Sequence, residues 1–140
     1  MDLRYHFWAS VVLVGVLYPF MGLHGVWAFV GAFLIDTDHY LYYAVKSKSW
    51  SLKKAYDFHV DKRKFAKNYV LHIFHTGEFI LFMIIMSIMI YNKKVLFLMF
   101  SVTLLGMVIH LTMDYMDMRK GKKWGIRAVW LTEWIARRRR

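Results

Sequence analysis

Three long apolar runs constrain this chain more than any other feature. Residues 69–91 and 95–113 contain few ionisable side chains, and residues 5–45 form a third run that is long enough for two helices. A helix needs about 20 residues at roughly 1.5 Å each to cross the hydrocarbon core of a bilayer. The chain is 59% hydrophobic and has only one proline and 8 glycines. We therefore predict an all-α integral membrane protein with a single domain over residues 1–140.

Turn residues divide these runs into four helices. Pro19, Gly22 and Gly25 lie where the first run should reverse, and an Asn-Lys-Lys sequence at 92–94 separates the last two. A signal peptide is an alternative for the first run, but its apolar core would be shorter, and no small-residue cleavage site follows. The prediction is a membrane four-helix bundle with spans at about 6–18, 25–45, 69–91 and 95–113.

The distribution of Lys and Arg predicts the orientation of this bundle. Of the 20 basic residues, 18 lie at Arg4, in the 46–67 loop or after residue 118, which leaves only Lys93 and Lys94. Basic loops stay on the cytoplasmic side, so we expect both termini in the cytoplasm of a multi-pass protein of the cell (inner) membrane. The net charge of +11 sits at the ends of the spans. Anionic lipid headgroups are therefore expected as partners, and nucleic acid is not.

A last amphipathic segment follows the fourth span. Between about residues 124 and 136, Trp130 and Trp134 recur at helical spacing opposite Arg127 and Glu133. Such a pattern is typical of a helix that lies in the membrane interface. We predict an interfacial helix on the inner leaflet.

Acidic and imidazole side chains gather at one depth of the predicted bundle. A charged group near the bilayer centre costs roughly 2.5 to 3.5 kcal/mol even on mild scales, so it needs a partner or a wet cavity. In the four-span topology the cytoplasmic half contains His6, Asp36, Asp38, His39, His72, His75, Glu78, His110, Asp114 and Asp117. His24, Asp2, Asp57 and Glu133 are expected to be solvated, while His59 and Asp61 are left undecided.

Helical spacing suggests that this group binds metal. His110 and Asp114 share one helix face, and Asp36 and His39 form an i, i+3 pair. With no cysteine in the chain, nitrogen and oxygen ligands favour zinc, with manganese or iron as alternatives, and one to three ions. Asp36 and Asp38 lie about 200° apart on an ideal helix, so both face inward only if the helix unwinds there.

The motifs resemble a known family. An early His6, the Asp-Thr-Asp-His sequence at 36–39, a His-Thr pair at 75–76, and a Gly-x-x-x-His-x-x-x-Asp sequence at 106–114 are similar to the membrane-bound metal-dependent hydrolases. These are also called the LexA-binding, inner-membrane-associated hydrolases. Ile35 stands where the family usually has proline. The resemblance implies an α-helical fold distantly similar to zinc-dependent phospholipase C and P1-type nucleases, and phosphoester-cleaving chemistry.

The leading hypothesis is a metal-dependent hydrolase that cleaves a phosphoester in a lipid or lipid-linked substrate at the inner leaflet. Glu78 is the expected general base, with His72 as the second choice. The expected metal ligands are His6, Asp36, Asp38, His39, His75, His110 and Asp114. The residues expected to attract an anionic headgroup are Lys62, Arg63, Lys64 and Arg119.

Two other functions fit parts of the sequence. Histidines on facing helices are the usual axial pair of a haem-binding electron-transfer protein in the membrane. A non-catalytic membrane adaptor could use the basic loop and the 137–140 arginine tail to recruit acidic partners. The acidic residues beside the histidines favour a metal over a porphyrin, and the adaptor needs no polar cluster in the helices.

Overall fold

The structure is a computed structural model that describes residues 3–60, 70–120 and 127–138. Its elements, in chain order, are α1 (Leu3–Met21), η1 (Gly22–Gly25), α2 (Val26–Phe33), η2 (Leu34–Asp36), α3 (Thr37–Ser47), α4 (Leu52–Val60), η3 (Ile73–His75), α6 (Gly77–Met89), α7 (Lys94–Lys120) and α8 (Leu131–Arg138), where η marks a 3-10 helix. Within the described ranges the β-structure is one isolated bridge between Val70 and Arg127. The predicted all-α class is confirmed.

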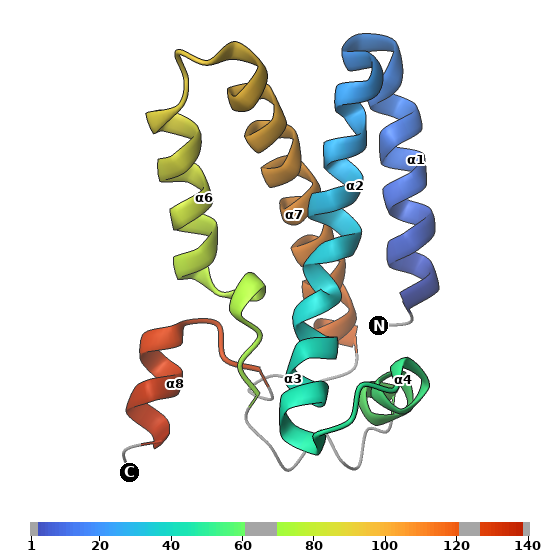
Figure 1. The fold of residues 1–140 in the computed structure, drawn as a ribbon, viewed down its shortest axis with the longest axis vertical. Helices are drawn as coiled ribbons and strands as arrows, with labels where there is room; N and C mark the ends of the chain where they lie inside the picture. The colour runs from blue at the N-terminus through green and yellow to red at the C-terminus, as the bar shows by residue number, and fades with distance from the viewer. Residues whose placement is uncertain (1–2, 61–69, 121–126, 139–140) are drawn as a thin grey trace.

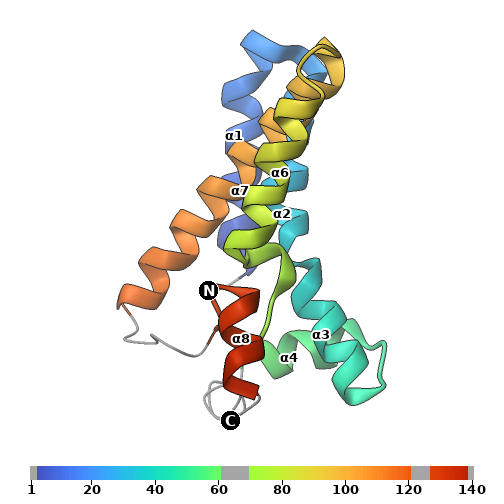
Figure 2. The ribbon, with the colours of Figure 1, turned by 90° about the vertical axis from the view of Figure 1, so that its left-hand side faces the viewer.

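The helices form two hairpins that pack side by side (Figure 1). The first hairpin is α1 with α2, the second is α6 with α7, and α2 packs along α7 between them. Figures 1 and 2 show α3, α4 and α8 at one end of the hairpins, which we call the basal end, with α8 and α4 on opposite sides of α3 in Figure 1. Both chain termini are nearer this end than the two hairpin turns are.

Two helical segments are long and apolar enough to cross a membrane. They are the helical run Leu3–Ser47, which contains the first hairpin, and the helix Lys94–Lys120. The predicted third span at 69–91 is wrong in its first part, because Gly77–Met89 alone is a regular α-helix. Thr76 begins that helix as its N-cap, with a hydroxyl that accepts a hydrogen bond from the Phe79 N–H. The residues before it approach in extended and 3-10 conformations.

The turn of the first hairpin lies later than the sequence suggested. α1 continues through Pro19 to Met21, although proline removes one helical hydrogen bond. The chain reverses at Gly22, whose φ of 53° lies in the left-handed region that glycine adopts without a Cβ clash. The chain therefore turns at the predicted glycines, but α1 is longer than the predicted span of residues 6–18.

A 3-10 turn breaks the second predicted helix. Instead of one helix over 25–45, α2 ends at Phe33, η2 runs over Leu34–Asp36, and α3 starts at Thr37. A 3-10 turn has three residues per turn, so it changes the phase of the side chains that follow. This break lies where the sequence required one for Asp36 and Asp38 to face the same side.

Close contact between α2 and α7 depends on glycine. A Cβ added at Gly31 would collide with the Thr103 carbonyl, and one at Gly106 would collide with the Ala28 carbonyl. Small residues let helix backbones approach closely, as in many membrane helix pairs. This crossing fixes the part of α7 that carries His110 directly beside η2.

The C-terminal segment folds back onto the start of α6. The Ala128 N–H donates to the Val70 carbonyl at 3.0 Å, and the Gly77 N–H donates to the Val129 carbonyl at 2.9 Å. The predicted helix at 124–136 is corrected, since the described part is helical only over Leu131–Arg138. In both views α8 runs roughly along the bundle and not across it, unlike a helix that lies flat on a membrane (Figures 1 and 2).

Candidate metal centre

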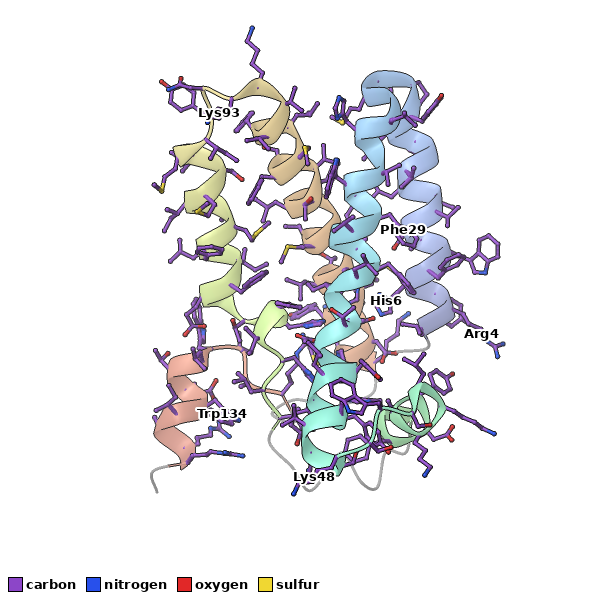
Figure 3. The ribbon with its side chains drawn as sticks, viewed as in Figure 1. Arg4, His6, Phe29, Lys48, Lys93 and Trp134 are labelled. Atoms are coloured by element: carbon purple, nitrogen blue, oxygen red, sulfur yellow. The ribbon has the colours of Figure 1, made fainter. Side chains whose placement is uncertain are left out.

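Four elements bring acidic and imidazole groups together near the basal end. His6 comes from α1, Asp36 from η2, His75 from η3, and His110 with Asp114 from α7. Figure 3 shows His6 pointing from α1 into the bundle. His6, His75 and His110 are all buried. The predicted convergence of these five residues is therefore present in the structure.

Four possible donor atoms lie close together in this cluster. The Nε2 atoms of His75 and His110 lie 3.2 Å apart. Asp36 Oδ1 is 3.5 Å from the first of these nitrogens and 3.4 Å from the second. Asp114 Oδ2 is 3.8 Å from each. We call Asp36, His75, His110 and Asp114 the central cluster.

Hydrogen bonds fix the proton positions on the two imidazoles. His110 Nδ1 lies 2.6 Å from the Ala32 carbonyl oxygen, which can only accept, so this nitrogen carries the proton. His75 Nδ1 lies 3.0 Å from Asp38 Oδ2, and the Phe74 N–H donates to the same oxygen at 3.0 Å. In the neutral form, each ring therefore presents the lone pair of Nε2 to the central cluster.

These distances match the edges of a metal tetrahedron. A zinc ion with bonds of about 2.0 to 2.1 Å holds its tetrahedral ligand atoms roughly 3.3 to 3.4 Å apart. Five of the six edges of the central cluster measure 3.2 to 3.8 Å. The Asp36 carboxylate would offset part of the charge of such an ion, while the charge of Asp114 is shared with the Arg127 guanidinium at 2.7 Å. The central cluster could therefore hold a small divalent metal ion.

Asp38 orients His75 instead of facing the centre itself. Its Oδ2 holds both the His75 ring and the Phe74 backbone N–H, and its Oδ1 has no hydrogen-bond partner within the described residues. A carboxylate that accepts from the far nitrogen of a metal-binding imidazole fixes the ring and raises its basicity. After the 3-10 turn, Asp36 therefore faces the central cluster while Asp38 holds the His75 ring.

His6 and His39 lie next to the central cluster, and each is close to a different one of its two carboxylates. His6 Nε2 is 3.4 Å from Asp114 Oδ1, and its ring stacks on His110 with centroids 4.1 Å apart. His39 Nε2 is 3.3 Å from Asp36 Oδ1. Two groups, His6 with His110 and Asp114, and His39 with Asp36 and His75, each have ligand atoms within 4.8 Å. Both flanking residues are close enough to bind an ion that shifts towards them.

Arg127 is a member of the site that sequence reasoning missed. Its Nη1 donates to Asp114 Oδ2 at 2.7 Å from the C-terminal segment. The sequence placed Arg127 on the polar side of an interfacial helix, and no spacing in the chain links it to Asp114. The contact arises only because the Val70 bridge holds the C-terminal segment against the bundle.

Several predicted site residues have other surroundings. The carboxylate of Glu78 accepts hydrogen bonds from the backbone N–H groups of Leu131 and Thr132 and from the Thr132 hydroxyl, at 2.9 to 3.2 Å. Glu78 therefore caps α8. Arg119 is exposed at the end of α7. The other three predicted headgroup residues, Lys62, Arg63 and Lys64, lie outside the described residues.

A second group of imidazoles adjoins the central cluster. His39, His59 and His72 come from α3, α4 and the segment before η3, and one ring nitrogen of each lies within 4.8 Å of the others. His72 is fully buried, and its Nδ1 is 3.7 Å from Asp38 Oδ1. Burial lowers the pKa of His59 to about 4, which keeps this ring neutral near pH 7.

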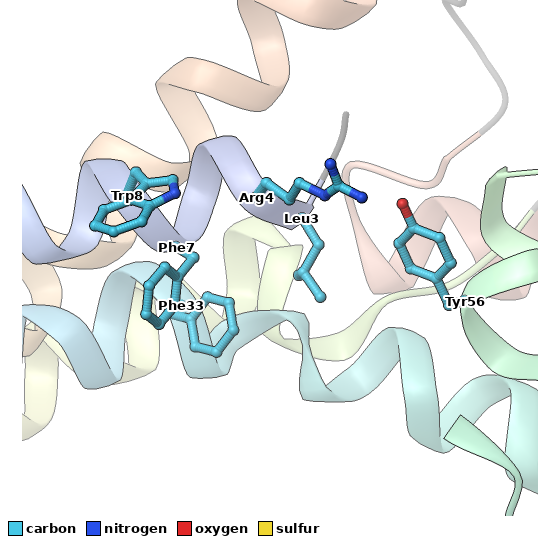
Figure 4. Close-up of a pocket in the computed structure, with 6 residues that line it drawn as sticks. All are labelled: Leu3, Arg4, Phe7, Trp8, Phe33 and Tyr56. Carbon is cyan, nitrogen blue, oxygen red and sulfur yellow. The ribbon is translucent and has the colours of Figure 1, made fainter. Parts of the chain in front are cut away.

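An apolar groove opens on the outside of α1 near the same end. It has a volume of about 420 Å³ and is lined by Leu3, Arg4, Phe7, Trp8, Phe33 and Tyr56. In Figure 4 the aromatic rings of Phe7 and Phe33 lie side by side, while Arg4 and Tyr56 turn their polar ends towards each other. The groove is therefore apolar along most of its length and polar at one end.

Comparison of the chain with family models, curated proteins and solved structures gives no match. The resemblance to membrane-bound metal-dependent hydrolases rests on the motif residues alone.

Proposed function

We propose that this chain is a membrane-embedded, metal-dependent hydrolase that cleaves a phosphoester in a lipid or lipid-linked substrate. The observation that carries the proposal is the central cluster, in which the Nε2 atoms of His75 and His110 face each other at 3.2 Å. Two facing lone pairs repel unless a proton or a metal ion lies between them, and an oxygen of each carboxylate lies 3.4 to 3.8 Å from both nitrogens. A divalent ion satisfies all four groups.

The chemistry follows from such a centre. A divalent ion held there would supply Lewis acidity, which lowers the pKa of water and polarises a phosphoryl oxygen. Among the acidic and imidazole side chains around the central cluster, His39, Asp36 and Asp114 are the least buried, at 24%, 16% and 13% exposed. Substrate and water therefore approach from the side of these three residues, while His75 and His110 hold their positions in the interior.

Two features support a lipid substrate. The apolar lining of the groove along Phe7 and Phe33 suits an acyl chain, and the Arg4 guanidinium at its polar end suits a phosphate. His6, Asp36 and His59 lie within three residues along the chain of the groove residues Phe7, Phe33 and Tyr56. A lipid in the groove would thus have its headgroup on the side of the metal centre.

The surface of the bundle supports insertion in a membrane. Large apolar side chains face outward along α1, α6 and α7, among them Val12, Phe20, Ile88 and Val95. Four spans with cytoplasmic termini would place the basal end at the inner leaflet. Lys93 lies at the opposite end from Lys48 and Trp134 (Figure 3), in line with the uneven distribution of basic residues.

The haem alternative gains no support from the geometry. The imidazoles of His6 and His110 stack directly on each other, so no porphyrin fits between them, and carboxylates surround the others. An absorption spectrum of the purified protein without a Soret band would remove haem. The adaptor hypothesis predicts that variants of the central cluster function normally, so these variants also test that hypothesis.

The test is an assay of purified, zinc-loaded protein on vesicles that contain phosphomonoester and phosphodiester lipids. We expect hydrolysis by the wild type and loss of at least about 100-fold in Asp36→Asn, because that change removes one charge and one donor atom from the centre. Asp57→Asn, on the exposed face of α4, is the matched control and should keep full activity. Hydrolysis that survives Asp36→Asn unchanged would exclude the central cluster as the active site.

A further inference from the structure

Three imidazoles beside the central cluster form a set that contains no carboxylate. Their ring centroids are 3.7 Å apart for His39 and His72, and 5.1 Å apart for His39 and His59. They belong to three separate elements, so no local helical spacing brings them together. One ring nitrogen of each histidine lies within 4.8 Å of a ring nitrogen of each of the other two.

The surrounding contacts orient these rings for ligation. His59 Nδ1 lies 2.8 Å from the Ala55 carbonyl oxygen, which can only accept, so the proton is on Nδ1 and the lone pair is on Nε2. This is the arrangement that a backbone carbonyl gives to a metal-binding histidine. It is also the arrangement of His110 with Ala32 in the central cluster.

His39 connects the two groups. Its Nε2 faces Asp36 at 3.3 Å, whereas its Nδ1 is buried and has no hydrogen-bond partner within the described residues. A buried polar nitrogen without a partner costs free energy, and a cation on that side would remove the cost. The Asp38 Oδ1 lies 3.7 Å from His72 Nδ1 and would help to balance a cation, whereas the Arg127 guanidinium acts on His72 with the opposite sign.

We propose that His39, His59 and His72 form a second cation site, separate from the central cluster, that binds zinc or another late first-row divalent ion. Three neutral imidazoles favour zinc, copper or nickel, and they disfavour magnesium and calcium, which prefer oxygen. Three protein ligands leave one tetrahedral position open, as in catalytic zinc sites. His59 places α4 in the metal-binding part of the molecule. This site concerns metal binding alone and does not depend on the proposed hydrolysis.

Zinc titration of the purified full chain, with metal content measured per chain, tests the proposal. The variants are His59→Phe, which keeps an aromatic ring in the stacked group, His110→Ala in the central cluster, and His24→Ala in η1 at the far end as the matched control. We expect His59→Phe to bind one zinc ion fewer than the wild type and to keep the ion that His110→Ala loses. The control should match the wild type.

Cobalt substitution adds a spectroscopic readout. The visible absorption of Co²⁺ bound by three nitrogens should disappear in His59→Phe and remain in His110→Ala. Equal zinc stoichiometry in the wild type and His59→Phe, with unchanged cobalt spectra, would overturn the second site. If only His110→Ala loses metal, the central cluster is supported and the second site is rejected. If only His59→Phe loses metal, the second site is supported and the central cluster is rejected.

Discussion

His75 and His110 place their Nε2 atoms 3.2 Å apart, and in the neutral rings both of these nitrogens carry lone pairs. The Nδ1 atoms are already occupied, by Asp38 in one ring and by the Ala32 carbonyl in the other. Neither ring can turn to relieve the repulsion without breaking a buried hydrogen bond, which costs about 1 to 3 kcal/mol. A metal ion between the two nitrogens would remove this repulsion, and the first prediction below follows from that proposal.

The first prediction separates the roles of the two aspartates. Asp38→Asn should weaken zinc binding by about 10- to 100-fold, because the amide no longer fixes the proton on His75 Nδ1 while the four donor atoms remain. Asp36→Asn should weaken it more, since a donor atom is lost. Equilibrium competition with a coloured chelator measures both affinities. Equal losses in the two variants would show that Asp38 binds the ion directly.

Much of the site was predictable from the sequence, because ionisable residues in apolar helices need each other. The depth of His6, His110 and Asp114 follows from the span positions and the basic loops alone. The common face of His110 and Asp114 on α7 follows from their i, i+4 spacing. The structure brings these residues together as predicted.

The remaining features depend on backbone breaks and long-range contacts that have no periodic signal. The 3-10 turn at Leu34–Asp36 changes the phase of Asp36 against Asp38, and no proline or glycine in it marks the break. The segment before Gly77 is apolar enough to be mistaken for the start of a span, yet it is extended. Arg127 and His59 reach the site only through chain reversals, which a local pattern does not encode.

The second prediction concerns the crossing of α2 and α7. Gly31→Ala and Gly106→Ala should each destabilise the protein by about 1 to 3 kcal/mol, because the new methyl group meets backbone carbonyls that cannot move aside. Gly15→Ala is the matched control, since a Cβ there meets no atom within 4 Å. It should be neutral or stabilising by up to about 1 kcal/mol through helix propensity. Thermal unfolding in detergent compares the three, and equal midpoints would contradict close packing at this crossing.

The third prediction tests whether Glu78 caps α8 or acts as a base. Glu78→Ala removes the acceptor for three hydrogen bonds from Leu131 and Thr132, so α8 should detach and trypsin should cleave after Arg137 faster. Zinc content should stay at the wild-type value. Glu133→Ala, which removes only an exposed contact with Arg137, is the control. Slow cleavage together with complete loss of hydrolysis would instead support a catalytic Glu78.

The fourth prediction is a pH dependence of stability in the metal-free protein. The pKa of His59 falls from 6.5 to about 4 on folding, because burial disfavours the charged ring. Between these values the unfolded chain binds a proton that the folded chain does not, so His59 lowers stability as the pH falls from 6.5 to 4. His59→Phe should lose this part of the pH dependence. Chelator-treated wild type and variant, unfolded by heat at several pH values, give the difference, and parallel curves would refute it.

The last prediction concerns the apolar groove and the class of substrate. Trp8 and Phe20 are both exposed aromatic residues of α1, but only Trp8 lines the groove. If an acyl chain occupies the groove, Trp8→Ala should raise the KM for a lipid phosphoester several-fold and leave the hydrolysis of a soluble phosphoester unchanged. Phe20→Ala, at the far end of the helix, should change neither. The soluble substrate reports on the metal centre alone. An equal loss of hydrolytic activity on both substrates in Trp8→Ala would therefore mean that Trp8 supports the fold and that the groove does not bind the lipid.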